Sequence, residues 1–151
     1  TAKEIRAVVG LTRAAATAVG NYSSSLSEAA LAAGQTMNDL LTSGTWDEKI
    51  NAYTAAHLKM RAAVIARTEL SFAGNEGQDM LWNIAIDEGV LNPDYLRRRL
   101  VYAKGFACPI CTQIGEEEPV PFKAVFSNGK RNAPMHPNCV CRVVLVEHFE
   151  D

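Results

Sequence analysis

The cysteines of this chain lie close together near its C-terminal end, and this placement limits how they can be used. All 4 of them fall between residues 108 and 141 of a chain of 151 residues. The first 107 residues contain no cysteine, so disulfides cannot staple the fold along its whole length. The clustering therefore predicts one local site formed by the cysteines and their neighbours.

The cysteines form a C-x-x-C pair and a later C-x-C pair that follows a histidine. The first pair is Cys108 and Cys111, and the second segment contains His136, Cys139 and Cys141. Zinc takes four tetrahedral ligands, and two intervening residues let one tight turn present both thiolates to a single ion. Five candidate ligands thus compete for four positions in a predicted zinc site.

Two ligand sets fit this spacing. If the second segment is extended, Cys139 and Cys141 share one strand face, which gives an all-cysteine site with His136 in a supporting role. Alternatively, His136 is a ligand and one cysteine of the C-x-C pair is not. The interpretation without metal is a pair of disulfides, or free thiols packed in a small core. Because enough ligands are present to close the coordination shell, we expect a bound zinc to be structural.

Helical signals dominate the first part of the chain. Apolar residues recur at spacings of three and four from Ile50 to Phe72, which predicts a long helix continuing to about Gly89. Two shorter helices are expected before it, over about residues 1–20 and 26–41, each preceded by a capping-box sequence.

The pattern changes at Pro93, which is the first of the 6 prolines. Short β-branched or aromatic runs at 100–103 and 140–146 predict strands, and Asn128-Gly129 predicts a hairpin between strands. A small β-rich module is therefore expected after the helices.

These signals predict an α+β fold of two parts. A mainly α-helical N-terminal body with a long central helix occupies residues 1–92, and a small C-terminal β-rich module of zinc-binding type occupies residues 93–151. We expect the two to pack together as one compact unit. Neither a membrane span nor a signal peptide is visible, since no apolar run approaches the roughly 18–20 residues that cross a bilayer. A net charge of −2 argues against a protein that coats nucleic acid by bulk charge.

Polar residues of the long helix carry a further signal when they are read together with the candidate ligands. Ala66-Arg67-Thr68-Glu69 and Asn75-Glu76-Gly77 precede Cys108-Pro109-Ile110-Cys111 and His136-Pro137-Asn138-Cys139-Val140-Cys141. In this order the motifs resemble the phage Mu F-like head-morphogenesis proteins. In that family an A-R-T-E helix and an N-x-G precede a C-P-x-C and a closing H-P-N-C-R-C before a final strand. The resemblance covers about residues 60–146.

The chain departs from the family pattern in two places. Lys104-Gly105-Phe106-Ala107 stands where the family usually has an acidic and a basic residue, and Val140 replaces the usual arginine between the last two cysteines. Neither departure touches a candidate ligand, so the inference about the fold is unaffected.

The resemblance implies a minor capsid component of a tailed bacteriophage, without enzymatic activity. Such a protein is expected to act with the portal and other capsid proteins in head assembly and in genome packaging or delivery. Its expected location is the virion, and the host cytoplasm during assembly. No small-molecule substrate and no membrane partner are expected. Some relatives are fused to toxin or protease domains, so a fragment of a phage-delivered toxin or enzyme is one alternative.

The second alternative is a DNA-binding zinc module. Arg97, Arg98 and Arg99 form a basic triplet that can meet DNA phosphates, or can simply be solvated at the start of a strand. Two segments of the long helix also allow two interpretations each. Arg67 and Glu69 can form a polar network that ties the helix to the β module, or can be solvated, and the segment 75–77 can be a local turn.

Overall fold

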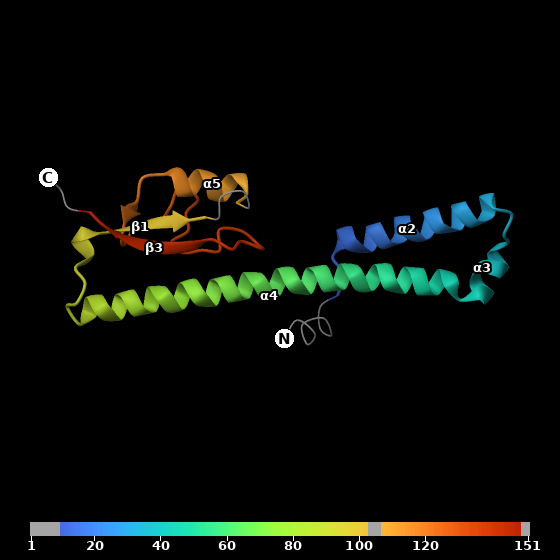
Figure 1. Ribbon diagram of the computed structural model, residues 1–151, viewed down its shortest axis with the longest axis horizontal. Coiled ribbons are helices and arrows are strands. Elements are labelled where there is room, and N and C mark those ends of the chain that lie inside the picture. Colours follow the sequence, from blue (N-terminus) through green and yellow to red (C-terminus); the bar gives the residue numbers. More distant parts are fainter. Residues whose placement is uncertain (1–9, 103–106, 149–151) are drawn as a thin grey trace. The chain divides into compact units, whose positions relative to one another are not determined.

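The computed structural model describes residues 10–102 and 107–148 (Figure 1). Helices make up most of it, and a small antiparallel sheet lies in the C-terminal part, which confirms the predicted α+β fold class. The chain divides into two compact units, Thr1–Ala63 and Val64–Asp151. This division differs from the boundary expected at residue 92, because the second half of the longest helix packs against the sheet. No helix in the described residues is long and apolar enough to cross a membrane.

In the described part of the first unit, the first two helices are α2 (Arg13–Ala32) and α3 (Met37–Ser43). The break expected near residue 20 is absent, and the helix expected over 26–41 is wrong, because α2 runs on to residue 32 through an alanine-rich stretch. One internal glycine costs a helix only about 1 kcal/mol. The next helix starts instead at a capping box in which Thr36 and Asp39 bond each other's backbone N–H groups. The capping box expected at residue 1 lies outside the described residues.

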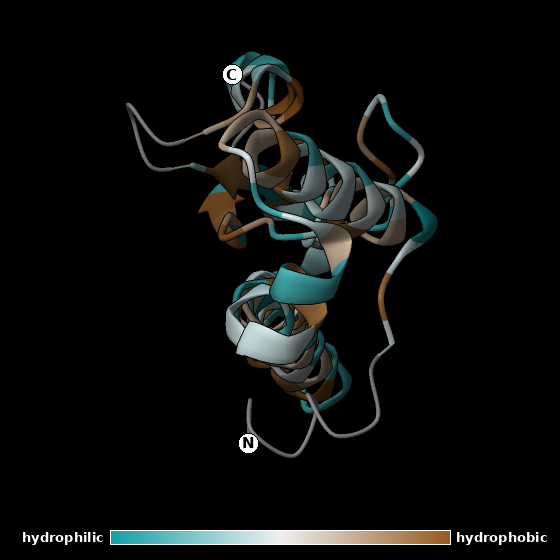
Figure 2. Cartoon of the chain, turned by 90° about the vertical axis from the view of Figure 1, so that its right-hand side faces the viewer, coloured by the Kyte–Doolittle hydropathy of each residue, from teal (hydrophilic) through white to brown (hydrophobic). Residues whose placement is uncertain are grey.

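The long central helix is confirmed as α4 (Thr45–Asp87), which has 43 residues. Its C-terminal end has the predicted glycine, since Gly89 adopts a φ of 74° and the Val90 N–H donates to the Ala85 carbonyl over 2.8 Å. Asn75 and Gly77 both lie inside this helix, so the local turn is wrong. Helices of the chain carry hydrophilic and hydrophobic residues around their axes (Figure 2).

The sheet of the second unit has the strand order β2-β1-β3, with both neighbouring pairs antiparallel. The strands are β1 (Leu96–Val101), β2 (Val120–Pro121) and β3 (Arg142–Glu147), so β1 begins earlier than predicted. The hairpin predicted at residues 128–129 is wrong: these residues form a loop turn, and in the described residues no strand directly flanks it. Strand pairing joins β1 to β3 across more than 40 residues of sequence, which a local turn signal cannot indicate.

A short 3₁₀ helix η1 (Pro93–Tyr95) precedes β1, and helix α5 (Pro109–Glu116) follows it. Alternate residues of β1 face the interior, which is why Leu96, Arg98 and Leu100 are all buried. The core of the second unit is small and contains three of the four cysteines. Its buried members are Leu100, Cys111, Ile114, Phe126, Ala133, Met135, Cys139, Cys141 and Val143.

Candidate metal centre

The C-P-x-C segment forms the start of α5. Cys108 is the N-cap residue, and its Sγ accepts a hydrogen bond from the Cys111 backbone N–H over 3.5 Å. Pro109 occupies the first helical position, where a backbone N–H is not needed. Both thiols therefore lie on the first turn, at the helix end that favours negative charge.

The H-P-N-C segment forms a tight turn. The Cys139 N–H donates to the His136 carbonyl over 3.2 Å, and Asn138 adopts a φ of 67°. A type II turn favours proline at its second position and glycine or asparagine at its third, which matches Pro137 and Asn138. The turn thus places His136 and Cys139 near each other.

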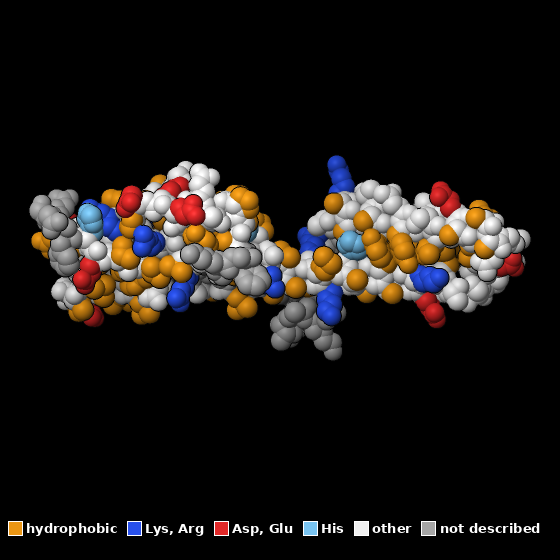
Figure 3. Space-filling view, turned by 45° about the horizontal axis from the view of Figure 1, so that its top comes forward, with side chains coloured by type: hydrophobic (Ala, Val, Ile, Leu, Met, Phe, Trp, Pro, Cys, Tyr) orange, Lys and Arg blue, Asp and Glu red, His pale blue; other side chains and the backbone are white. Residues whose placement is uncertain are grey.

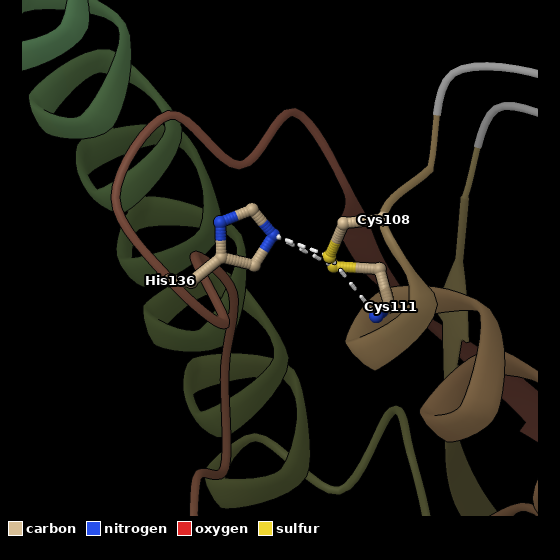
Figure 4. Close-up of side chains that lie close together, drawn as sticks. All are labelled: Cys108, Cys111 and His136. Atoms are coloured by element: carbon tan, nitrogen blue, oxygen red, sulfur yellow. Dashed lines mark hydrogen bonds between the residues drawn. The ribbon is translucent and has the colours of Figure 1, made fainter.

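The imidazole of His136 is oriented by the same turn. Its Nδ1 lies 2.7 Å from the Pro137 carbonyl oxygen, to which it donates. With the proton on Nδ1, the lone pair of Nε2 is free to bind a metal. Nε2 lies 3.0 Å from Cys108 Sγ and 3.2 Å from Cys111 Sγ (Figure 4).

Two groups of side chains in the described residues could each hold a metal ion: Cys108, Cys111 and His136, and Cys111, Cys139 and Cys141. Within each group the ligand atoms lie within 4.8 Å of one another, and Cys111 belongs to both. Cys111 Sγ lies 3.6 Å from Cys139 Sγ. Around tetrahedral zinc the ligand atoms would be about 3.5 Å apart for sulfur and nitrogen and about 3.8 Å apart for two sulfurs. The donor set and its spacing fit such an ion.

All five predicted ligands line one small cavity of about 170 Å³, together with Ala107, Asn138 and Val140. The structure thus brings together every residue predicted from the sequence for this site. Which four of them bind a metal stays a prediction. Residues 104–106, where the family pattern differs, lie outside the described residues.

The thiols are free and mostly buried. Cys111, Cys139 and Cys141 are all buried, and none of the four cysteines forms a disulfide. Burial, followed by hydrogen bonds among the cysteines, raises the pKa of Cys111, and burial raises the pKa of Cys141 to about 11. Burial opposes ionisation of Cys139 too, but hydrogen bonds to the backbone at Cys141 and Met135 lower its pKa overall. A cation bound here would stabilise the thiolates and release their protons.

Side chains of α4 contact the ligand turn. Arg67 Nη1 donates to Asn138 Oδ1 over 2.5 Å, and Thr68 Oγ1 accepts from the Asn138 backbone N–H over 2.8 Å. Arg67 therefore does form a polar link between the helix and the C-terminal segment. Glu69 is exposed, as the solvated alternative predicted.

Asn75 bonds the backbone of the two residues on either side of Arg142. Its Oδ1 accepts from the Val143 N–H over 3.0 Å, and its Nδ2 donates to the Ser71 and Cys141 carbonyls over 2.8 and 3.5 Å. Sequence reasoning missed this role. The available signal was the spacing of Thr68 and Asn75, since residues seven apart lie on the same face of a helix.

Arg98 is the second residue whose role the sequence interpretation missed. It is 0% exposed and pairs with Asp79, while its Nε donates to the Phe122 carbonyl over 2.6 Å and its Nη1 to Asn132 Oδ1 over 2.7 Å. Its guanidinium also lies 5.5 Å from the centre of the Trp82 ring. Arg98 cannot contact DNA from this position, so the predicted DNA contact is wrong for this one of the three arginines.

The signal for its burial was present in the strand. Leu96, Arg98 and Leu100 alternate with Arg97 and Arg99, and every second residue of a strand faces the same side. An arginine between two leucines on that side must enter the core with them.

The centre therefore offers four thiols and one imidazole inside a small, largely buried cavity. Such a donor set suits a soft or borderline divalent cation, and it is large enough to leave no open position for a substrate. No protein-family model, no curated protein and no solved structure matches this chain.

Proposed function

We propose that this chain is a non-enzymatic minor head protein of a tailed bacteriophage, and that a structural zinc ion stabilises its second unit. The observation that carries the metal part is the convergence of Cys108, Cys111, His136, Cys139 and Cys141 on one cavity. Thiolates and imidazole are the ligands that zinc prefers in structural sites.

The role of the metal follows from the size of the core. Three buried cysteines are themselves core residues, so the cavity they line is continuous with the hydrophobic cluster around Leu100 and Val143. A unit with so few buried apolar residues gains from a metal that links separate segments. Here the ion would link the start of α5 to the turn at residues 136–139, which leads into β3.

We propose Cys108, Cys111, His136 and Cys139 as the ligands. The His136 Nε2 is oriented toward two thiols by the bond from its Nδ1, and Cys139 Sγ lies 3.6 Å from Sγ of the shared Cys111. In this assignment Cys141 packs beside the ion without binding it.

Cobalt substitution tests the ligand set. With Co²⁺ in place of zinc, the Cys141→Ser variant is expected to keep the tetrahedral spectrum and the thiolate-to-metal absorption of three sulfurs, because its sulfur is not a ligand. The matched His136→Asn variant is expected to change the spectrum. Loss of one thiolate contribution in Cys141→Ser, with an unchanged spectrum in His136→Asn, would establish the all-cysteine set instead.

The phage assignment is supported by the order of the sequence motifs. Arg67 and Thr68 belong to the A-R-T-E segment and Asn138 belongs to the H-P-N-C segment, and these two segments contact each other through hydrogen bonds. Contact between them gives both motifs one shared structural purpose. We accordingly propose the portal and other capsid proteins as partners, with the protein in the virion and, during assembly, in the host cytoplasm.

DNA binding is the second candidate, and a specific feature of the sheet favours it. Arg97 and Arg99 on β1 and Arg142 on β3 lie on the sheet face opposite the buried Arg98, and Arg99 and Arg142 are exposed. Figure 3 shows Lys and Arg side chains among hydrophobic ones on this unit.

One comparison separates the two candidates. For a head protein, we expect the full chain to co-purify with assembled heads or with portal protein and to bind duplex DNA weakly even at low salt. For a DNA-binding module, we expect an affinity that falls with salt, with a slope reduced by about one in Arg99→Gln. Binding to neither heads, portal nor DNA would contradict both candidates.

A further inference from the structure

We infer that Thr68, Arg67 and Asn75 of α4 are positioning residues for the metal, acting through the segment that carries His136, Cys139 and Cys141. The inference rests on the proposed zinc site. It adds to that site three residues that are not ligands themselves but bond the segment that carries the ligands. All three side chains lie on the long helix. Arg67 and Thr68 bond Asn138, which is adjacent to Cys139, and Asn75 bonds the backbone of Cys141 and Val143, so none of them bonds a ligand atom.

The first link is made at the turn. Asn138 is the residue between Pro137 and Cys139, and its φ of 67° is one that few residues other than glycine and asparagine adopt readily. Its backbone N–H is bonded to Thr68 Oγ1 and its side-chain oxygen to Arg67, so both of its polar ends are attached to α4. This attachment fixes the direction of the turn and hence of His136 and Cys139.

The acceptor in this link is itself oriented. Thr68 Oγ1 donates its own proton to the Val64 carbonyl over 2.8 Å, one helical turn earlier. The hydroxyl lone pairs therefore remain available to the Asn138 N–H. A threonine hydroxyl is thus used as a fixed acceptor, which serine can reproduce and valine cannot.

The second link is made where the chain leaves the site for β3. The Asn75 side chain, which is 9% exposed, accepts from the Val143 N–H and donates to the Cys141 carbonyl. It therefore holds the two residues on either side of Arg142 against α4. Together the two links attach both ends of the segment 138–143 to one rigid helix.

Residues that orient metal ligands without touching the ion typically change metal affinity by 10- to 100-fold when they are replaced. We therefore expect Thr68→Val to weaken zinc binding by about 10-fold or more in competition with a chromophoric chelator. Thr68→Ser should restore wild-type affinity. Glu69→Gln, an exposed change on the same helical turn, is the matched control and should leave the affinity unchanged.

Position 138 supplies an independent series. Asn138→Gly keeps a residue that accepts a positive φ but removes the acceptor for Arg67, whereas Asn138→Ala removes the acceptor and also strains the turn. We expect affinity to fall in the order wild type, Asn138→Gly, Asn138→Ala. At saturating Co²⁺ every one of these variants should show the wild-type spectrum, because the ligand set is intact.

The outcomes distinguish this inference from the proposed site. If wild-type protein binds neither Zn²⁺ nor Co²⁺, the proposed metal site fails. If the wild-type protein binds zinc, and Thr68→Val and Thr68→Ser both bind zinc with the wild-type affinity, the positioning role is overturned while the proposed metal site stands. A purely structural role would lower the helix content of the metal-free Thr68→Val protein by circular dichroism and leave its metal affinity unchanged, and this result too would overturn the inference.

Discussion

Replacing Cys111 by serine is expected to unfold the second unit and to leave the helices of the first unit in place. Cys111 is 1% exposed, belongs to both groups of candidate ligands and lies in the core cluster. Structural zinc contributes about 10–16 kcal/mol of apparent binding free energy in small zinc domains, which is comparable to the whole stability of a typical domain. Without the metal, the small core is not expected to stay folded.

Hydrogen exchange resolved along the chain checks this result. Amides of residues 96–101 and 142–147 should lose protection in Cys111→Ser, while those of α2 keep it. The same pattern should appear when a strong chelator is added to the wild-type protein. Val140→Ala is the matched control, since Val140 lines the same cavity but is 59% exposed. Equal protection of both strands in Cys111→Ser and wild type would rule out a metal that stabilises this unit.

Asp79→Asn is expected to lower the free energy of unfolding of the second unit by about 3–5 kcal/mol, because it leaves the Arg98 charge buried without its carboxylate partner. The guanidinium is completely buried and cannot turn to solvent without opening the core. The remaining partners of Arg98, at Phe122 and Asn132, are neutral oxygens that cannot balance its charge.

Urea denaturation of the zinc-loaded protein measures this change. Arg99→Gln provides the control, because Arg99 is the neighbouring exposed arginine and its replacement should change stability by no more than about 0.5 kcal/mol. Combining Asp79→Asn with Arg98→Met removes the buried charge, so the double variant should be more stable than Asp79→Asn alone. Equal stability of Asp79→Asn and wild type would show that the pair contributes nothing to the fold.

Local signals predicted the parts of this protein that depend on neighbouring residues. The spacing of apolar residues from Ile50 to Phe72 predicted the body of α4, and Gly89 marked its C-terminal end, because both features act within one or two helical turns. The segments that carry the predicted ligands also depend on neighbouring residues. Pro109 begins α5 next to Cys108, and Asn138, with its positive φ, forms the turn next to Cys139.

Other predictions were wrong where the local sequence pattern is compatible with a second structure that the chain adopts instead. The sequence around Ser25 fits a capping box, yet it lies inside α2, where Ser24 and Ser27 donate to carbonyls one turn earlier. Asn128-Gly129 fits a hairpin, yet β1 takes β2 and β3 as its partners. In both cases the pattern is compatible with two structures, and more distant residues select between them.

The sequence by itself determined the α+β class, the extent of α4 and the five side chains of the candidate metal centre, because helix periodicity and ligand type are properties of the residues and their spacing. Only the tertiary structure decided that the division of the chain falls within α4, that Arg98 is buried against Asp79, and that Asn75 and Thr68 hold the segment beside the ligands. These depend on contacts between residues 19 to 70 positions apart, which form when the sheet packs against the second half of α4.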